Sequence, residues 1–138
     1  MNFILYADGG SRGNPGPSGA GALVRDEEGI QVVTVSEYLG SATNNIAEYT
    51  ALLRALQGLQ KLLGTAVSGA TVEARLDSQL VVRQMNGEYK IKHPNIVPLA
   101  AEVKEMVRAF KSVSFTHVYR EDNAEADSLA NEAMDRGH

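Results

Sequence analysis

The sequence contains no cysteine, and this absence removes several kinds of chemistry at once. A disulfide framework, a thiolate nucleophile and a zinc site with cysteine ligands are all excluded. Internal repeats, low-complexity runs and flexible linkers are also missing, so we expect residues 1–138 to form a single domain. Apolar residues make up 43% of the chain and charged residues 22%, a composition typical of a globular protein with its own core.

Long hydrophobic runs are absent as well. No stretch approaches the ~18 apolar residues that cross a bilayer, and we expect no membrane partner. The apolar start, Met1–Tyr6, is too short for a signal peptide and lacks both a basic leader and a small-residue cleavage site. The sequence therefore predicts a cytoplasmic protein.

The chain also lacks a surplus of positive charge. Thirteen lysines and arginines stand against seventeen acidic residues, which gives a net charge of −4. Because proteins that bind nucleic acids are usually basic, this charge taken alone argues against a polyanionic partner.

The first third of the chain has the pattern of an antiparallel meander. Short apolar or β-branched runs predict strands over Phe3–Asp8, Ala20–Arg25 and Ile30–Leu39. Residues 9–19, between the first two, hold five glycines and two prolines, so we expect this run to break regular structure and to need a positive φ. It is either a tight hairpin or a backbone that approaches a ligand closely, with Asn14 supplying an amide.

The remaining two thirds alternate helices and strands. Apolar residues spaced by three and four predict a long helix from residue 46 to 63, capped by Thr43 or Asn44 and stopped at Gly64. The later elements are a strand over Thr71–Leu76, a short helix capped by Ser78, a helix over Val97–Phe110, a strand over Val113–Tyr119 and a last helix capped by Asn123. Helical crossovers permit parallel pairing. The pattern predicts an α/β fold: a five-stranded mixed sheet, antiparallel in its first three strands and then parallel, with helices on both faces.

Four carboxylates occupy places where this fold would bring them together. Asp8 and Asp77 end the first and fourth strands, where α/β sheets bind ligands, and Glu48 and Asp127 lie in the first turns of two helices. Each one alone has an ordinary explanation as a turn residue, a cap or a partner of the helix dipole. Together they would repel one another unless cations lay among them. Hard oxygen ligands suit Mg²⁺ or Mn²⁺, and two such ions can clamp both oxygens of a phosphoryl transfer.

Other motifs carry weaker signals. The glycine-rich run lacks the Gly-Lys-Ser/Thr of a phosphate-binding loop and leads into a strand, which excludes a dinucleotide fingerprint. His117 alternates within a strand, and we expect a half-buried structural histidine there. Lys90, Lys92 and His93 share a loop that either contacts phosphates or is simply solvated.

Four segments in order resemble the motifs of ribonuclease H, type 1. They are Asp8–Gly21 (DGGSRGNPGPSGAG), Thr43–Tyr49 (TNNIAEY), Leu76–Val81 (LDSQLV) and Arg120–Ala130 (REDNAEADSLA). They span almost the whole chain, and their combination is specific although each alone is weak. The resemblance implies a ribonuclease H-like catalytic domain over residues 1–138.

The resemblance also implies a function. It points to an endonuclease that cuts the RNA strand of an RNA–DNA hybrid with two metal ions, leaving 5′-phosphate and 3′-hydroxyl ends. The residues it implies are the metal-binding and catalytic carboxylates Asp8, Glu48, Asp77 and Asp127, the hybrid-contacting amides Asn14, Asn44, Asn45 and Gln79, and the phosphate contact Thr43. Amides suit 2′-hydroxyls and minor-groove edges because they both donate and accept hydrogen bonds.

Two departures from the family pattern stand out. Many members carry a histidine in the loop before the fourth aspartate. In this chain that loop is short and has no histidine, and Arg120 is the residue nearest to the position of that histidine. We assign Arg120 to product release or a phosphate contact, since a guanidinium is a poor base. Some bacterial members insert a basic, tryptophan-rich helix and loop, but this chain has no tryptophan. It resembles the compact members, and we expect weaker hybrid affinity or dependence on a partner domain.

The resemblance changes the meaning of the net charge. With four of the seventeen acids assigned as metal ligands, the other thirteen balance the thirteen basic residues. Two Mg²⁺ or Mn²⁺ ions would cancel the four ligand charges. We therefore expect the affinity for phosphates to be modest and to depend on bound metal.

Three alternatives stay open at this point. The same fold could be a binding module without activity, which intact carboxylates at all four positions disfavour. It could be another nuclease or a transposase, which the asparagine and glutamine set disfavours. Cleavage of double-stranded RNA in addition to the hybrid also stays open. We expect a monomer.

Overall fold

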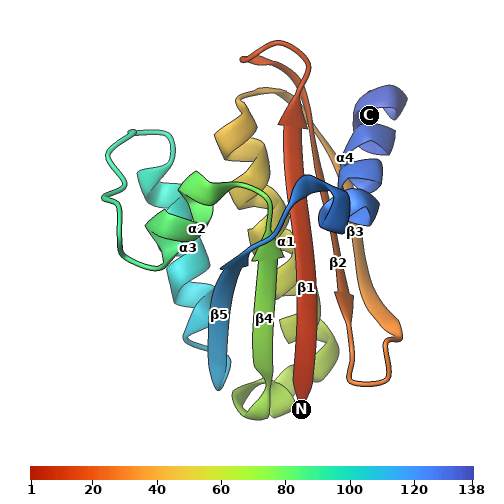
Figure 1. Cartoon of the computed structure of the whole chain (residues 1–138), viewed down its shortest axis with the longest axis vertical. Coiled ribbons are helices and arrows are strands. Elements are labelled where there is room, and N and C mark those ends of the chain that lie inside the picture. Colours follow the sequence, from red (N-terminus) through yellow and green to blue (C-terminus); the bar gives the residue numbers. More distant parts are fainter.

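The strands form one mixed sheet in the order β3-β2-β1-β4-β5, as Figure 1 shows. The computed structural model describes residues 1–138. Its elements are β1 (Asn2–Ser11), β2 (Gly16–Arg25), β3 (Gln31–Ala42), α1 (Asn44–Leu63), β4 (Thr71–Leu76), α2 (Gln79–Met85), α3 (Val97–Val107), β5 (Ser112–His117) and α4 (Ala124–Arg136), with 3₁₀ turns at Gly64–Gly69 and Arg120–Asn123. β1 pairs antiparallel with β2 and parallel with β4, which confirms the predicted fold.

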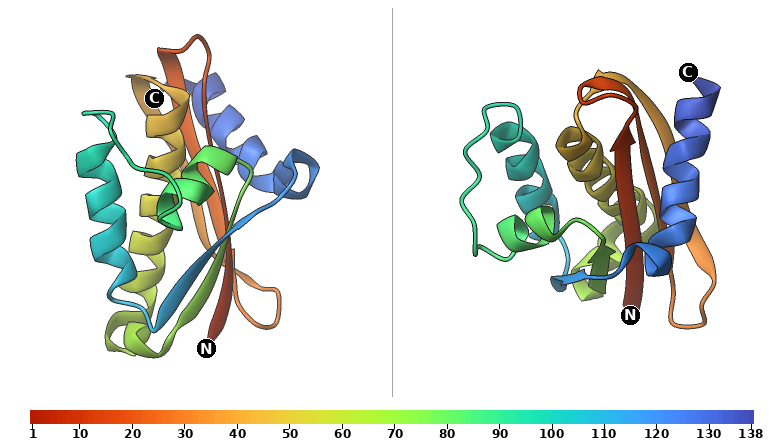
Figure 2. Two further views of the ribbon diagram at one scale, coloured as in Figure 1. Left: turned by 60° about the vertical axis from the view of Figure 1, so that its left-hand side comes forward. Right: turned by 45° about the horizontal axis from the view of Figure 1, so that its top comes forward.

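Helices cover both faces of the sheet. α1, α2 and α3 lie on one side and α4 lies alone on the other, a three-layer arrangement that is visible edge-on in Figure 2. α1 contributes more residues to the core than any other element, and its leucines at residues 52, 56 and 59 are fully buried together with Leu5 and Val72 of the sheet. α4 buries only alanines, Ala126, Ala130 and Ala133, so it packs very close to the strands. None of these helices combines the length and apolarity that crossing a membrane requires.

The glycine-rich run does not break the strands, contrary to the sequence prediction. β1 continues through Gly9 and Gly10 to Ser11, and β2 already begins at Gly16, so only residues 12–15 form the turn. The predicted positive φ is present at Gly13, whose φ is 93°. Glycine tolerates extended backbone, and the missing side chains create room for the helices that pack on the strands.

Most of the predicted helix boundaries are confirmed. The Thr43 hydroxyl accepts a hydrogen bond from the Ile46 amide and begins α1, which ends at Gly64 with φ 57°. The Ser78 hydroxyl caps α2 in the same way. Asn123 is the N-cap residue of α4, as predicted, but its side chain makes no capping hydrogen bond. One expectation was wrong: His117 is exposed at the end of β5 rather than half-buried.

Candidate active site

Two of the four carboxylates come from neighbouring parallel strands. Ala7 of β1 pairs with Leu76 of β4, and each is followed directly by an aspartate, Asp8 or Asp77. Their side chains therefore emerge at the same level of the sheet. Asp8 is not the last residue of its strand as predicted, because β1 runs on to Ser11.

The third carboxylate, Glu48, reaches the strands because Gly9 lets α1 approach closely. A Cβ built on Gly9 would lie 2.2 Å from the carbonyl carbon of Ala47 and 2.3 Å from the amide nitrogen of Glu48. No side chain fits in that space. The close contact between the backbones of β1 and α1 therefore fixes the position of Glu48 relative to Asp8.

The fourth carboxylate, Asp127, is also positioned by glycines that let a helix approach the sheet closely, in this case on the opposite face. Asp8 pairs across the strands with Gly21. A Cβ on Gly21 would lie 2.2 Å from the carbonyl oxygen of Ala126, and one on Gly19 would lie 2.4 Å from that of Ala130. α4 thus sits directly on β2, and its first turn carries Asp127 to Asp8.

These placements produce one acidic cleft. Carboxylate oxygens of Asp8, Glu48 and Asp77 lie within 4.8 Å of one another, and Asp127 faces the same cleft from the α4 side. All four line a cleft of about 450 Å³. The structure therefore brings together all four carboxylates that the sequence singled out.

The electrostatics of this cleft favour the neutral forms of its most buried acids. Burial, followed by the charge of Asp77 and the contact with Asp127, raises the pKa of Asp8 from 3.8 to about 8. Burial also raises the pKa of Glu48 from 4.5 to about 7; a hydrogen bond from Ser78 opposes this rise and the charge of Asp77 adds to it. Both shifts arise mainly from burial, and the charge of the neighbouring Asp77 adds to them.

The same acids fit a divalent cation. Oε2 of Glu48 is buried and has no hydrogen-bond partner in the protein, which is costly unless another group satisfies it. A set of carboxylate oxygens at this spacing is the donor set that Mg²⁺ and Mn²⁺ prefer. A bound cation would satisfy the orphaned oxygen and would lower the raised pKa values.

Of the predicted substrate-binding residues, Asn44 lines the cleft, and Asn14 is hydrogen-bonded to it. The Asn44 side-chain oxygen accepts from the Ser11 amide at 2.8 Å, and the Asn14 oxygen accepts from the Asn44 amide at 3.1 Å. These bonds tie the β1–β2 turn to the start of α1 and leave the side-chain NH₂ groups as donors for a ligand. Asn45 and Gln79 are exposed in the first turns of α1 and α2. The hydroxyl of Thr43 is engaged by the Ile46 amide.

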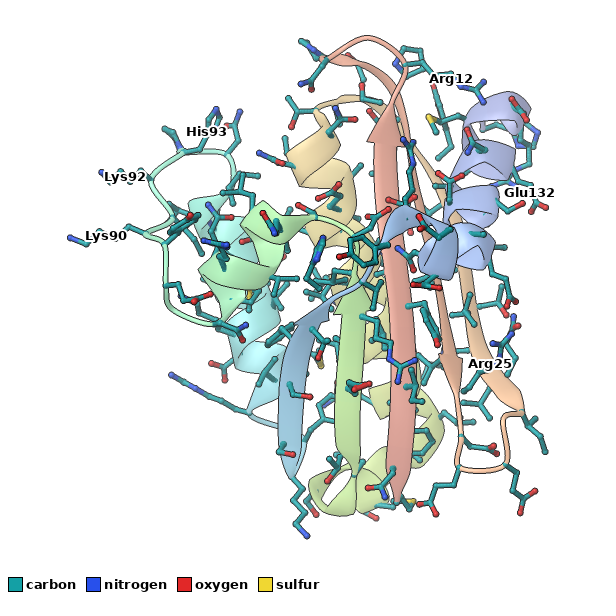
Figure 3. The ribbon with its side chains drawn as sticks, in the orientation of Figure 1. Arg12, Arg25, Lys90, Lys92, His93 and Glu132 are labelled. Carbon is teal, nitrogen blue, oxygen red and sulfur yellow. The ribbon has the colours of Figure 1, made fainter.

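Two cationic side chains line the cleft. Arg120 is exposed on the short loop before α4 and borders the same space as Asp127, close to where the sequence predicted it. Arg12 belongs to the cleft as well, and sequence reasoning missed it. Arg12 lay inside the first motif, but no local pattern indicates that its side chain reaches α4. Lys90, Lys92 and His93 stand on the loop between α2 and α3, far from Arg12 and α4 (Figure 3).

The sequence and the fold are similar to those of known proteins. A family model described as "Reverse transcriptase-like" matches residues 6–133. A bifunctional protein of Mycobacterium tuberculosis is 44% identical over 98% of this chain, which spans only 36% of that relative's length. LC11-RNase H1, isolated from compost and solved in complex with an RNA/DNA hybrid, is 45% identical over 97% of both chains, with a TM-score of 0.91.

A second solved structure gives the same picture. RNase H1 of the halophilic archaeon Halobacterium salinarum is 38% identical over 99% of each chain, with a TM-score of 0.89. Both solved proteins share the fold described above over nearly their full lengths. Identity at this level, across chains of nearly equal extent, means that this chain belongs to the type 1 ribonuclease H family of nucleases.

Proposed function

We propose that the chain hydrolyses the RNA strand of RNA–DNA hybrids and leaves 5′-phosphate and 3′-hydroxyl ends. The observation that carries the proposal is the convergence of Asp8, Glu48 and Asp77 within 4.8 Å, with an orphaned Glu48 oxygen among them. The complex of LC11-RNase H1 with an RNA/DNA hybrid supports the choice of substrate.

The carboxylates divide into two overlapping ligand sets. Asp8 and Asp127 would hold one Mg²⁺ or Mn²⁺ ion, and Asp8, Glu48 and Asp77 would hold the other. When bound, such ions lower the pKa of an attacking water and stabilise the leaving oxygen. In the balanced reaction, a water oxygen bonds to phosphorus, the P–O3′ bond breaks, and a proton goes to the 3′ oxygen.

The residues around the cleft position the hybrid. Asn14, Asn44, Asn45 and Gln79 would donate to and accept from 2′-hydroxyls and minor-groove edges, which exist in this combination only where an RNA strand is present. Thr43 would contact a phosphate at the start of α1, and Arg120 would contact a phosphate or assist product release. Recognition of the 2′-hydroxyl is what separates a hybrid from a DNA duplex.

Cleavage of a labelled hybrid across a metal series tests the proposal. Asp8→Asn and Asp77→Asn keep the side-chain shape and remove a ligand charge, so both should abolish Mg²⁺-dependent cleavage. Glu132→Gln is the matched control, since Glu132 lies exposed on α4 away from the cleft (Figure 3). Wild-type rates in either aspartate variant would contradict the assignment.

The substrate is tested separately. Cleavage of the hybrid but not of a DNA duplex is the expected result, and a double-stranded RNA substrate decides whether that activity is present too. Binding of the hybrid without any cleavage in Mg²⁺ or Mn²⁺ would instead identify a binding module. We further propose that the chain acts as a cytoplasmic monomer, which sedimentation of the active protein would check.

A further inference from the structure

The catalytic cleft is short of positive charge for a polyanionic substrate. Four carboxylates line it, and Arg12 and Arg120 are its only cationic side chains. Metal ions would face the phosphate that is cut, but the phosphates beside it need other partners. Arg120 already has a proposed role, so Arg12 is the cation whose purpose is unexplained.

Arg12 occupies an exchangeable ion pair. It begins the β1–β2 turn, and its guanidinium contacts α4, 2.6 Å from the Asp135 carboxylate and 3.4 Å from the Asn131 side-chain oxygen. The Arg12 side chain is 46% exposed and that of Asp135 69%. Exposed pairs of this kind contribute little to stability because water and salt compete with them. A phosphate that enters the cleft can therefore replace the carboxylate.

We propose that Arg12 binds a backbone phosphate of the substrate strand in the cleft, and that Asp135 is its resting partner and competes with the substrate. This inference rests on the proposed function. A guanidinium offers two parallel N–H donors to a phosphate, as it does to a carboxylate. Asn14 lies two residues further along the same turn, so one short segment would present both an amide and a cation to the hybrid.

A purely structural role predicts a different pattern. If the pair only clamps the turn to α4, then removal of either partner loosens the turn, and both variants should weaken the substrate complex. If Arg12 binds phosphate, Arg12→Ala weakens binding, whereas Asp135→Asn strengthens it by releasing Arg12. The two roles thus predict opposite signs for Asp135→Asn.

Steady-state cleavage of a labelled hybrid at several salt concentrations distinguishes these roles. We expect Arg12→Ala to raise KM several-fold, with a smaller effect on kcat, and to reduce the slope of log kcat/KM against log salt by about one. Arg12→Lys should restore part of the affinity. Asp135→Asn should lower KM about twofold. Arg108→Ala is the control, because Arg108 forms an exposed pair with Glu105 on α3, outside the cleft.

The possible outcomes separate the two proposals. A wild-type protein that fails to cleave the hybrid in any metal would overturn the proposed function. A wild-type protein that cleaves, with KM and salt slope unchanged in Arg12→Ala, would overturn only the role of Arg12. A rise in KM in both Arg12→Ala and Asp135→Asn, accompanied by loss of thermal stability, would identify the pair as a clamp.

Discussion

The side-chain amide of Asn123 donates a hydrogen bond of 2.9 Å to the carbonyl oxygen of Ala7. Asn123 is 1% exposed and immediately precedes α4, while Ala7 immediately precedes Asp8. One bond across 116 residues of sequence therefore joins the strand that carries Asp8 to the helix that carries Asp127. Asn123 is a positioning residue in this arrangement, because it does not line the cleft and acts through the backbone next to Asp8.

Loss of this bond should disturb both stability and the site. We expect Asn123→Ala to cost about 1–2 kcal/mol, since it leaves a buried carbonyl without its partner but also removes the unpaired Asn123 Oδ1. Asn86→Ala is a matched control, because Asn86 makes the same kind of amide-to-carbonyl bond to Phe115 in an exposed place. Urea unfolding measures the difference. Equal losses in the two variants would contradict a special role for Asn123.

The close approach of α4 to β2 predicts the effect of a single methyl group. In Gly21→Ala the new Cβ would lie 2.2 Å from the carbonyl oxygen of Ala126, so α4 must move away from the sheet. We expect a loss of about 1–3 kcal/mol, typical of overpacking, together with weaker Mg²⁺ binding because Asp127 moves with the helix. Isothermal titration with Mg²⁺ and urea unfolding measure the two effects.

A second glycine provides the control for that experiment. Gly69 has open space around its Cβ position and no positive φ, so Gly69→Ala should leave both stability and metal binding close to wild type. If Gly21→Ala behaved like Gly69→Ala, the contact between strand and helix would not be what places Asp127.

The raised pKa values predict how the metal-free protein responds to pH. Asp8 titrates at about 8 in the folded state instead of 3.8, so its protonated form is favoured by folding. That stabilisation is complete below the unfolded value near 3.8 and is lost as pH rises through about 8. In EDTA we therefore expect the free energy of unfolding to fall between pH 5 and pH 8 more steeply in the wild type than in Asp8→Asn.

Added Mg²⁺ should reverse this trend, because a cation compensates for the deprotonated carboxylates and binds better as they lose their protons. Glu132→Gln should show the same pH dependence as the wild type, since Glu132 is exposed and does not line the cleft. The test is urea unfolding at a series of pH values with EDTA or with Mg²⁺. An identical slope for Asp8→Asn and the wild type in EDTA would disprove the predicted role of Asp8.

The elements of the fold were readable from the sequence because their signals are local. The helical spacing of apolar residues, the cap at Thr43 and the stop at Gly64 each act within a few residues. The signals for Asp77, Glu48 and Asp127 were a strand end and the early turns of two helices. Asp8 lies inside β1 rather than at its end, but the parallel pairing of β1 with β4 still places it beside Asp77.

The parts that could not be predicted depend on contacts between distant segments. The run from Gly9 to Gly19 reads as a breaker when it is taken alone, yet Gly9 and Gly19 are strand residues because α1 and α4 occupy the space of the missing side chains. Asn123 reads as a helix cap, but its amide is used by Ala7, 116 residues away. The sequence identifies Arg12 only as a turn residue, because its contacts with α4 depend on how that helix packs on the sheet.

Arg120 gives the last prediction. It is exposed and borders the cleft beside Asp127, where it can reach a phosphate or the product. A hydrogen bond to a charged group is worth about 1.5–3 kcal/mol, so Arg120→Ala should lower kcat/KM roughly tenfold to a hundredfold. Arg120→Lys should recover part of this loss. Because a guanidinium does not titrate below pH 12, the effect of Arg120→Ala should be constant from pH 6 to pH 9. A loss that varied with a pKa near 6.5, or unchanged turnover and affinity in Arg120→Ala, would remove Arg120 from the site.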